Sequence, residues 1–363
     1  MTWSRSLAGT IRPSLVLGGP GALDLLPARS AAAAEAGSHL FVLTDDNVMA
    51  LWGFPALRLM GAAASIEDIL VVPPGETSKS VARLAECWDW MAARGARRND
   101  ILVALGGGVV GDLAGLTAAT YLRGMSLWQI PTTLLAQVDS SVGGKTGVNL
   151  EAGKNLVGSF YQPELVIVDP ATLATLPEDE YIGGLGEVVK YGLLHGEDLF
   201  STLETNTAAI AARDQAIMGD LVRRCVEYKA AVVEEDELDQ GRRAVLNLGH
   251  TAAHALERTL GYGNISHGRA VALGLLVAAA LSERLLGLDP DVRVRTRRLL
   301  GKLRLAASIA LPPVDSLLTA ASRDKKVTAG TTGFVGLAAI GAPVWGVNVP
   351  ASHFAEALGV IRI

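Results

Sequence analysis

The stretch that decides the fold is Ile101-Leu-Val-Ala-Leu-Gly-Gly-Gly-Val-Val-Gly-Asp112, an apolar run that leads into three glycines and then a helix-forming segment. Such a strand–turn–helix unit lets backbone N–H groups approach a phosphate, and the helix N-terminus adds partial positive charge. The pattern is GGGxxGD rather than GxGxxG, and a triple glycine can also merely close a strand–helix corner. Because Asp112 stands just inside the helix, we favour pyrophosphate binding.

Short apolar runs on both sides of this stretch predict further buried parallel strands. They are Leu40–Thr44, Ile69–Val72, Trp128–Ile130 and Leu165–Val168. After Asp169-Pro170 the segments become helix-length and rich in Ala and Leu, at Tyr181–Leu194, Thr207–Val233, Leu246–Leu260, Gly268–Leu285 and Arg293–Leu305. The sequence therefore predicts an α/β protein with a Rossmann-like nucleotide-binding domain over 1–178 and an all-helical domain over 179–363. We expect the active site between them.

Composition excludes several classes of protein. With 363 residues, a net charge of −5 and 5% aromatic residues, the chain lacks the basic face or stacking rings of a nucleic-acid binder. The N-terminus shows no secretory pattern, and Cys87 and Cys225 form no CxxC pair or disulfide framework, so we expect a soluble cytoplasmic protein. Only eight of the 32 basic residues are Lys, which predicts that the lysines stand where a compact ammonium is needed.

Three of the six histidines, His250, His254 and His267, fall within eighteen residues. The spacing of the first two puts both imidazoles on one helix face, which suits a shared zinc ion, although no Glu follows His250 as in the HExxH signature. Another stretch, Gly143-Gly-Lys-Thr146, invites a P-loop interpretation, which fails because the required earlier glycine is replaced by Asp139.

A consistent series of motifs resembles the 3-dehydroquinate synthases, members of the sugar phosphate cyclases. The motifs are Gly106–Asp112, Thr120–Gly124, Pro131–Asn149, Gly153–Asn155, Phe160–Pro163, Glu187–Gly192, Leu246–Thr251, His267-Gly268 and Asp324–Lys326. The resemblance implies a carbon–oxygen lyase of the shikimate pathway, which leads to chorismate and the aromatic amino acids. That enzyme cyclises 3-deoxy-D-arabino-heptulosonate 7-phosphate to 3-dehydroquinate by transient oxidation with NAD, phosphate elimination, re-reduction and an intramolecular aldol step, with Zn²⁺ or Co²⁺.

The resemblance also implies a role for individual residues. The matching metal ligands are Glu187, His250 and His267, so that His254 becomes an acid/base residue at the phosphate end rather than a second ligand of a His pair. The catalytic group comprises His254, Asp239, Lys145, Arg243 and Asn247. The substrate-binding group comprises Arg123, Asp139, Asn155, Lys190, Lys229 and Lys326. The NAD-binding group comprises Asp45, Asn47, Glu76, Lys79, Gly107, Gly108, Val109, Asp112, Thr132, Thr133, Lys154, Thr172 and Thr175.

Several positions depart from the family pattern. Asp239 stands where the family has a longer Glu as proton acceptor, Arg269 replaces a usual acidic residue, and Ala252-Ala253 replaces a larger aromatic–glycine pair. Arg269 would alter either the charge of the site or only the surface. The alternatives are an aminodehydroquinate synthase or another sugar phosphate cyclase, and then a metal-dependent polyol dehydrogenase, whose uncharged substrate would not need so many cationic residues. The family also implies a homodimer, in which residues near Arg123 approach the neighbouring subunit.

Overall fold

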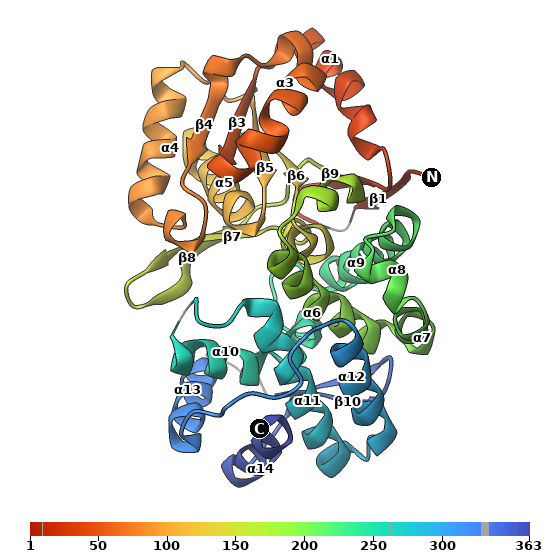
Figure 1. Cartoon of the computed structure of the whole chain (residues 1–363). Coiled ribbons are helices and arrows are strands. Elements are labelled where there is room, and N and C mark those ends of the chain that lie inside the picture. Colours follow the sequence, from red (N-terminus) through yellow and green to blue (C-terminus); the bar gives the residue numbers. More distant parts are fainter. Residues whose placement is uncertain (9, 262, 328–333) are drawn as a thin grey trace. The chain divides into compact units, whose positions relative to one another are not determined.

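The computed structural model describes residues 1–8, 10–261, 263–327 and 334–363, with the backbone alone over 323–327. The chain forms two compact units, shown in Figure 1. The first unit contains Met1–Leu176 and Lys229–Leu238, and the second contains Pro177–Tyr228 and Asp239–Ile363. Helix α9 (Gln215–Glu235) therefore begins in the second unit and ends in the first. The boundary that we predict at 178/179 does not include this return of the chain.

The first unit is built on a seven-stranded sheet with the order β1-β2-β9-β6-β5-β3-β4. All neighbouring strands run parallel except β1 and β2. The strands are β1 (Trp3–Leu7), β2 (Ser14–Gly18), β3 (Leu40–Asp45), β4 (Ile69–Val72), β5 (Ile101–Gly106), β6 (Ser126–Pro131) and β9 (Leu165–Val168). All five predicted strands are present, which confirms the Rossmann-like class, whereas β1 and β2 were not predicted.

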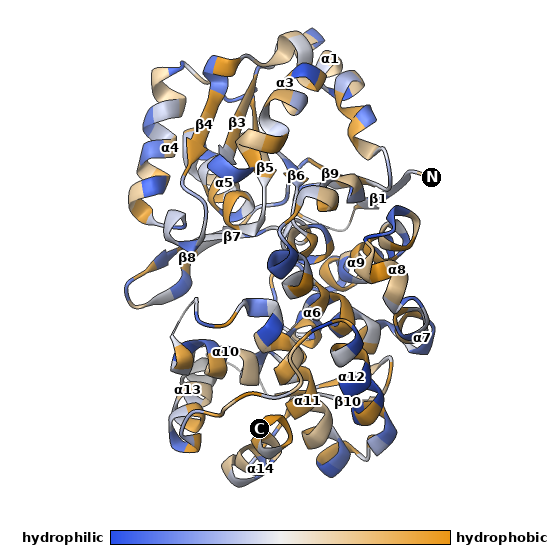
Figure 2. Ribbon diagram, viewed as in Figure 1, coloured by the Kyte–Doolittle hydropathy of each residue, from blue (hydrophilic) through white to orange (hydrophobic). Residues whose placement is uncertain are grey.

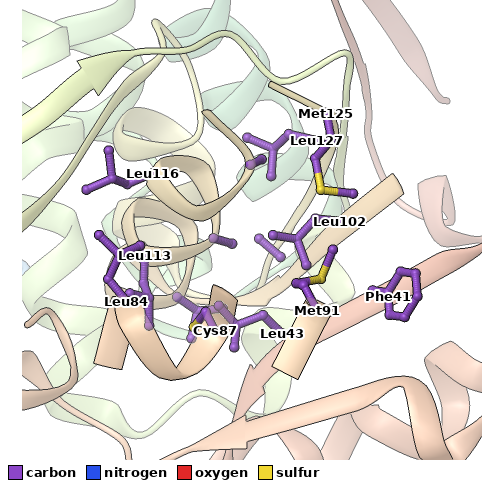
Figure 3. Packing of buried hydrophobic residues seen from close by; sticks show 14 of the residues in the cluster. Phe41, Leu43, Leu84, Cys87, Met91, Leu102, Leu113, Leu116, Met125 and Leu127 are labelled. Carbon is purple, nitrogen blue, oxygen red and sulfur yellow. The ribbon is translucent and has the colours of Figure 1, made fainter. Parts of the chain in front are cut away.

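Alternate side chains of the central strands pack on opposite faces of the sheet. Phe41 and Leu43 of β3 join one core with the helices α4 (Val81–Ala93) and α5 (Gly108–Thr120), as Figure 3 shows. Leu40 and Val42 join a second core with α1 (Leu26–Glu35) and α3 (Phe54–Met60). Because β3 and β5 are buried on both faces, they are continuous apolar runs, and Figure 2 shows them as hydrophobic.

A hairpin outside the main sheet completes the first unit, together with several short helices. It consists of β7 (Lys145–Leu150) and β8 (Gly153–Phe160), which pair antiparallel. The short helices are α2 (Asp46–Val48), η1 (Ala22–Leu25), η2 (Met49–Gly53), η3 (Gly61–Ala63), η4 (Ile66–Asp68), η5 (Glu76–Ser78), η6 (Tyr121–Arg123), η7 (Ala136–Ser140) and η8 (Pro170–Thr175).

The second unit is helical, as predicted, and has one small sheet in addition. Its helices are α6 (Glu178–His195), α7 (Glu197–Thr205), α8 (Thr207–Ala211), the first part of α9, η9 (Arg242–Asn247), α10 (His250–Leu260), α11 (His267–Leu286), α12 (Pro290–Lys302), α13 (Val314–Val327), α14 (Ala351–Ala357) and η10 (Leu358–Ile361). Strands β10 (Phe334–Ala339) and β11 (Ala342–Val347) pair antiparallel. None of the described helices has both the length and the apolar character needed to cross a bilayer.

Two predicted helices differ from the observed ones. The segment 207–233 is not one helix, because the chain leaves helical geometry at Arg213, where φ is 56°, between α8 and α9. The segment 246–260 divides into η9 and α10, because Gly249 adopts a left-handed conformation with φ 80° at the N-cap of α10. Both breaks depend on single residues that a periodicity of apolar positions does not reveal.

Candidate functional site

Three helices of the second unit cross closely at glycines, and these crossings bring the predicted metal ligands together. A Cβ atom on Gly186 of α6 would lie 2.1 Å from the carbonyl oxygen of Gly268 on α11. A Cβ atom on Gly274 of α11 would likewise lie 2.0 Å from the carbonyl oxygen of Gly249, which precedes α10. Since real Cβ atoms do not approach that closely, only glycine allows these helices to pack at this distance.

The residues next to these glycines form a group of three donor atoms. Oε1 of Glu187 lies 3.5 Å from Nε2 of His250 and 3.5 Å from Nε2 of His267. The Nδ1 atom of His250 is 3.2 Å from the Leu248 carbonyl oxygen, an acceptor, so Nδ1 carries the proton and Nε2 keeps its lone pair. Two imidazole nitrogens and one carboxylate oxygen therefore converge on one point.

This donor set fits a zinc-like ion. Ligand atoms about 2.1 Å from a tetrahedral metal are separated from one another by roughly 3.4 Å, close to both measured separations. Burial lowers the pKa of His250 to about 3, so its ring is neutral and able to ligate at neutral pH. Burial alone would also lower the pKa of His267, but hydrogen bonds to Glu187 and Glu257 raise it to about 10. The carboxylates around His267 thus favour a cation at this place.

Three other charged or titratable side chains surround the donor set. Lys190, one helical turn after Glu187, forms an ion pair with that carboxylate, and both side chains are buried. The ring of His254 lies 5.5 Å from that of His250 and 6.2 Å from that of His267, measured between centroids. Glu257, which our sequence analysis missed, places Oε1 3.4 Å from Nδ1 of His267. Its position three residues after His254, on the same helix face, was the signal available.

The residues predicted to bind NAD lie in the first unit, mostly just beyond the carboxyl ends of parallel strands. Asp45 ends β3, Glu76 and Lys79 follow β4, the glycine turn with Val109 follows β5, Thr132 and Thr133 follow β6, and Thr172 and Thr175 follow β9. The chain order reverses beside β3, which pairs with β4 on one side and β5 on the other. Ligands of open α/β sheets bind at such a switch point.

Two features of this edge fit a nucleotide. A Cβ atom on Gly107 would lie 2.9 Å from Cγ2 of Thr133, so a side chain there would crowd the turn from which the N-terminus of α5 begins. The hydroxyl oxygen of Thr132 is buried and has no hydrogen-bond partner within the described residues. Asp45 caps α2 by accepting from Val48 N–H at 2.9 Å, Asn47 is exposed beside it, and Thr175 accepts from Trp52 Nε1 at 2.9 Å.

Lys79 joins the nucleotide edge to the β7–β8 hairpin. Its buried ammonium donates to Asp112 Oδ2 at 2.5 Å and to Asn155 Oδ1 at 2.6 Å. Asn149 links the same segments, because its side chain donates to Glu76 at 2.8 Å and accepts from the Asn155 N–H at 2.8 Å. A residue predicted to bind substrate, Asn155, is thereby placed beside two predicted to bind cofactor. Lys154 precedes it on β8.

The other predicted substrate residues of the first unit fall into two places. Lys229 donates to the carbonyl and carboxylate of Asp139, at 2.6 and 2.9 Å, and Lys145 is an exposed residue at the start of β7. Arg123 is exposed near the C-terminal end of α5, whose 13 residues separate it from the glycine turn by about 20 Å. Within the first unit, Arg123 is therefore not brought together with the nucleotide edge.

The remaining predicted residues lie in the second unit. Arg243 is buried and Asn247 is exposed, both in η9, and Asp239 has φ 57° in the segment before η9. Lys326 belongs to α13, and its side chain lies outside the described residues. Arg269, which replaces the usual acid, forms an ion pair with the exposed Asp179 at 3.0 Å. That contact belongs to the surface alternative we left open.

Comparisons with known proteins identify the family. The family model described as 3-dehydroquinate synthase N-terminal matches residues 69–183, and the one described as 3-dehydroquinate synthase C-terminal matches residues 184–327. A curated 3-dehydroquinate synthase from Ruegeria sp. (strain TM1040) is 45% identical over 324 residues, which cover 87% of both chains.

Solved structures of two related enzymes share the fold over nearly the whole chain. A 2-deoxy-scyllo-inosose synthase complexed with carbaglucose-6-phosphate, NAD⁺ and Co²⁺ is 25% identical, with a TM-score of 0.85 over 98% of this chain and 99% of that chain. The 2-epi-5-epi-valiolone synthase of Streptomyces hygroscopicus subsp. jinggangensis 5008, with NAD⁺ and Zn²⁺ bound, is 25% identical, with a TM-score of 0.86 over 95% and 96%. The chain belongs to the 3-dehydroquinate synthase family and is an enzyme of that type.

Proposed function

We propose that the chain cyclises 3-deoxy-D-arabino-heptulosonate 7-phosphate to 3-dehydroquinate, with release of phosphate, as a carbon–oxygen lyase of the shikimate pathway. The observation that carries this proposal is the 45% identity to a 3-dehydroquinate synthase over 87% of both chains, against 25% for the two cyclases of known structure. The Gly143-Gly-Lys-Thr-Gly147 stretch supports it, because it lies within the Pro131–Asn149 motif that resembles the 3-dehydroquinate synthases.

We assign the nucleotide and the metal ion to different units. We assign NAD to the carboxyl edge of the sheet in the first unit, where its nicotinamide would supply an acceptor and donor of hydride. We assign Zn²⁺ or Co²⁺ to Glu187, His250 and His267, which would hold the ion so that it could polarise a substrate hydroxyl and lower its pKa. Both assignments agree with the ligands named for the two solved cyclases. Boundaries of 178/179 between a cofactor domain and a metal- and substrate-binding domain remain our proposal.

The chain's own residues orient a substrate that carries a phosphate and a carboxylate. Ammonium and guanidinium groups at Lys145, Lys190, Lys229 and Arg243 neutralise those anions, which the low-dielectric site would otherwise exclude. The other substrate contacts that we propose are made by Asn155, Asn247, Asp139, Arg123 and Lys326. His254, beside the metal ligands, holds and returns a proton at its ring nitrogen. Asp239 accepts a proton with a shorter reach than the Glu usual in the family.

The assembly of the enzyme follows from Arg123. Since this side chain is far from the nucleotide edge of its own first unit, we propose a homodimer in which Arg123 reaches the substrate of the neighbouring subunit. We further propose that the enzyme acts in the cytoplasm and does not bind nucleic acid, given its net charge of −5.

The test is a turnover assay with purified full-length chain, catalytic NAD and Zn²⁺. We expect one phosphate released per heptulosonate phosphate, without net accumulation of NADH. The substrate analogue with an amino group in place of a hydroxyl, and glucose 6-phosphate, are offered in parallel and should turn over at least about 100-fold more slowly, a difference of roughly 2.7 kcal/mol in transition-state stabilisation.

Three results would contradict the proposal. Preferred turnover of the amino analogue would identify an aminodehydroquinate synthase, and preferred turnover of glucose 6-phosphate would identify another sugar phosphate cyclase. Stoichiometric NADH without phosphate release would identify a dehydrogenase. The variant Glu187→Gln is the matched control for the role of the metal site in turnover. It keeps the size of the side chain but removes the charged ligand.

A further inference from the structure

We propose that Glu257 is a positioning residue for the metal site: it holds the ring of His267 through Nδ1, so that Nε2 is presented beside Glu187. The inference rests on the metal site proposed above. Oε1 of Glu257 lies 3.4 Å from Nδ1 of His267, and the Glu257 side chain is only 7% exposed. A carboxylate buried to this extent requires a partner of the opposite charge or a strong donor, and the imidazole N–H is one such donor.

The chemistry of imidazole makes this contact consequential. A neutral ring carries its proton on one nitrogen and ligates through the other, so the partner of the non-ligating nitrogen decides which nitrogen faces the metal. For His250 that partner is the uncharged carbonyl of Leu248. For His267 it is a carboxylate, which also makes the ring a stronger donor to the metal. We therefore expect metal binding through His267 to depend on the charge of Glu257, whereas His250 has only an uncharged backbone partner.

A different interpretation of the same atoms is a second cation site. Donor atoms of His254, Glu257 and His267 also lie within 4.8 Å of one another. A second ion there, together with the first, would need both nitrogens of His267 as ligands, and the ring would have to lose both protons. Glu257 as the acceptor of the Nδ1 proton needs no such bridging ring, so we infer one ion per chain.

The experiment is a titration of metal-depleted full-length chain with Co²⁺, followed by visible absorption and metal analysis. We expect one Co²⁺ per chain for the parent. The variant Glu257→Ala should weaken Co²⁺ binding by about 10- to 100-fold and change the absorption band. Glu257→Gln keeps an acceptor oxygen without the charge, so its Co²⁺ affinity should lie between that of the parent and that of Glu257→Ala. The control Glu283→Gln lies on α11 about 24 Å from His267 and pairs with Arg293, and it should bind Co²⁺ as the parent does.

Each outcome is decisive. Equal Co²⁺ affinity and equal absorption for the parent and both Glu257 variants would overturn the positioning role while leaving the metal site intact. Two Co²⁺ per parent chain, with one lost in Glu257→Ala, would make Glu257 a ligand and also overturn the proposal. If the parent binds no Co²⁺, the metal site itself fails. Thermal unfolding of the metal-free variants shows whether either substitution impairs folding. If Glu257→Ala does, the Co²⁺ affinity and absorption of Glu257→Gln decide whether Glu257 positions His267.

Discussion

At the scale of single residues, the Lys79 ammonium is a group whose burial has a measurable cost. It is 5% exposed and depends on Asp112 and Asn155 for its hydrogen bonds. We predict that Asp112→Asn lowers the free energy of unfolding by about 3 kcal/mol, because the buried Lys79 ammonium keeps its charge but loses the carboxylate nearest to it. Urea unfolding followed by circular dichroism measures this.

A matched control comes from an exposed ion pair. Glu86→Gln removes the partner of Arg83 on the surface of α4 and should cost less than about 1 kcal/mol. The double variant Lys79→Met with Asp112→Asn should recover part of the loss, which a double-mutant cycle resolves. Equal losses for Asp112→Asn and Glu86→Gln would show that the Lys79 pair contributes no more than a surface contact.

At the scale of elements, the α6–α11 crossing decides whether the three metal donors meet. We predict that Gly268→Ala destabilises the chain by about 1–3 kcal/mol and weakens Co²⁺ binding, because a Cβ atom would lie 1.7 Å from the Gly183 carbonyl oxygen and the helices must separate. The control Gly301→Ala on α12 meets no atom within 4 Å and should be neutral or slightly stabilising. Thermal unfolding and Co²⁺ titration check both, and unchanged binding in Gly268→Ala would refute the packing argument.

The contact between Asp100, which precedes β5, and His39, which precedes β3, gives a prediction about pH. Burial alone would raise the pKa of Asp100, but hydrogen bonds from Arg97 and from the His39 N–H outweigh burial and lower it below 3.8. A carboxyl with a lowered folded-state pKa stabilises the protein above its unfolded pKa and loses that contribution as the pH falls. Asp100→Asn should therefore be destabilised at pH 7, with a smaller difference from the parent below pH 3.8. A difference in urea midpoint that is the same at pH 7 and pH 3 would contradict this.

At the scale of the whole molecule, the two units should respond to different ligands. We predict that NAD slows hydrogen exchange of the backbone amides in the segments that follow β3, β5 and β6. Zn²⁺ should instead slow exchange of the backbone amides in α6, in α10 and at the start of α11. At a free ligand concentration 100 times the dissociation constant, binding stabilises the state it selects by about 2.7 kcal/mol. Exchange measured by mass spectrometry, with Mg²⁺ as the control ion, tests this. Protection by NAD in the second unit alone would contradict the assignment.

Much of the fold could be predicted because local runs of apolar residues mark most of the central strands. The runs that form β3, β5 and β9 are buried on both faces, so each is an apolar segment in the sequence. The edge strand β4 is apolar but only partly buried, and in β6 the buried Gln129 interrupts the apolar run. The strands β1 and β11 are largely exposed or half-buried, whereas β2 and β10 are mostly buried runs, rich in apolar residues, that our prediction did not include. Single positive-φ residues such as Arg213 end helices without changing the pattern around them.

The motifs of the sequence by themselves determined the family, the glycine turn after a strand, and the candidate ligands Glu187, His250 and His267. Only the tertiary structure decided that these three share one point, because the backbone contacts of Gly186 with Gly268 and of Gly249 with Gly274 join segments far apart in the chain. It also decided that Glu257 faces His267 and that Asn155 faces Lys79. Residue type limits what a side chain can bind, whereas the packing of distant backbone segments decides which side chains meet.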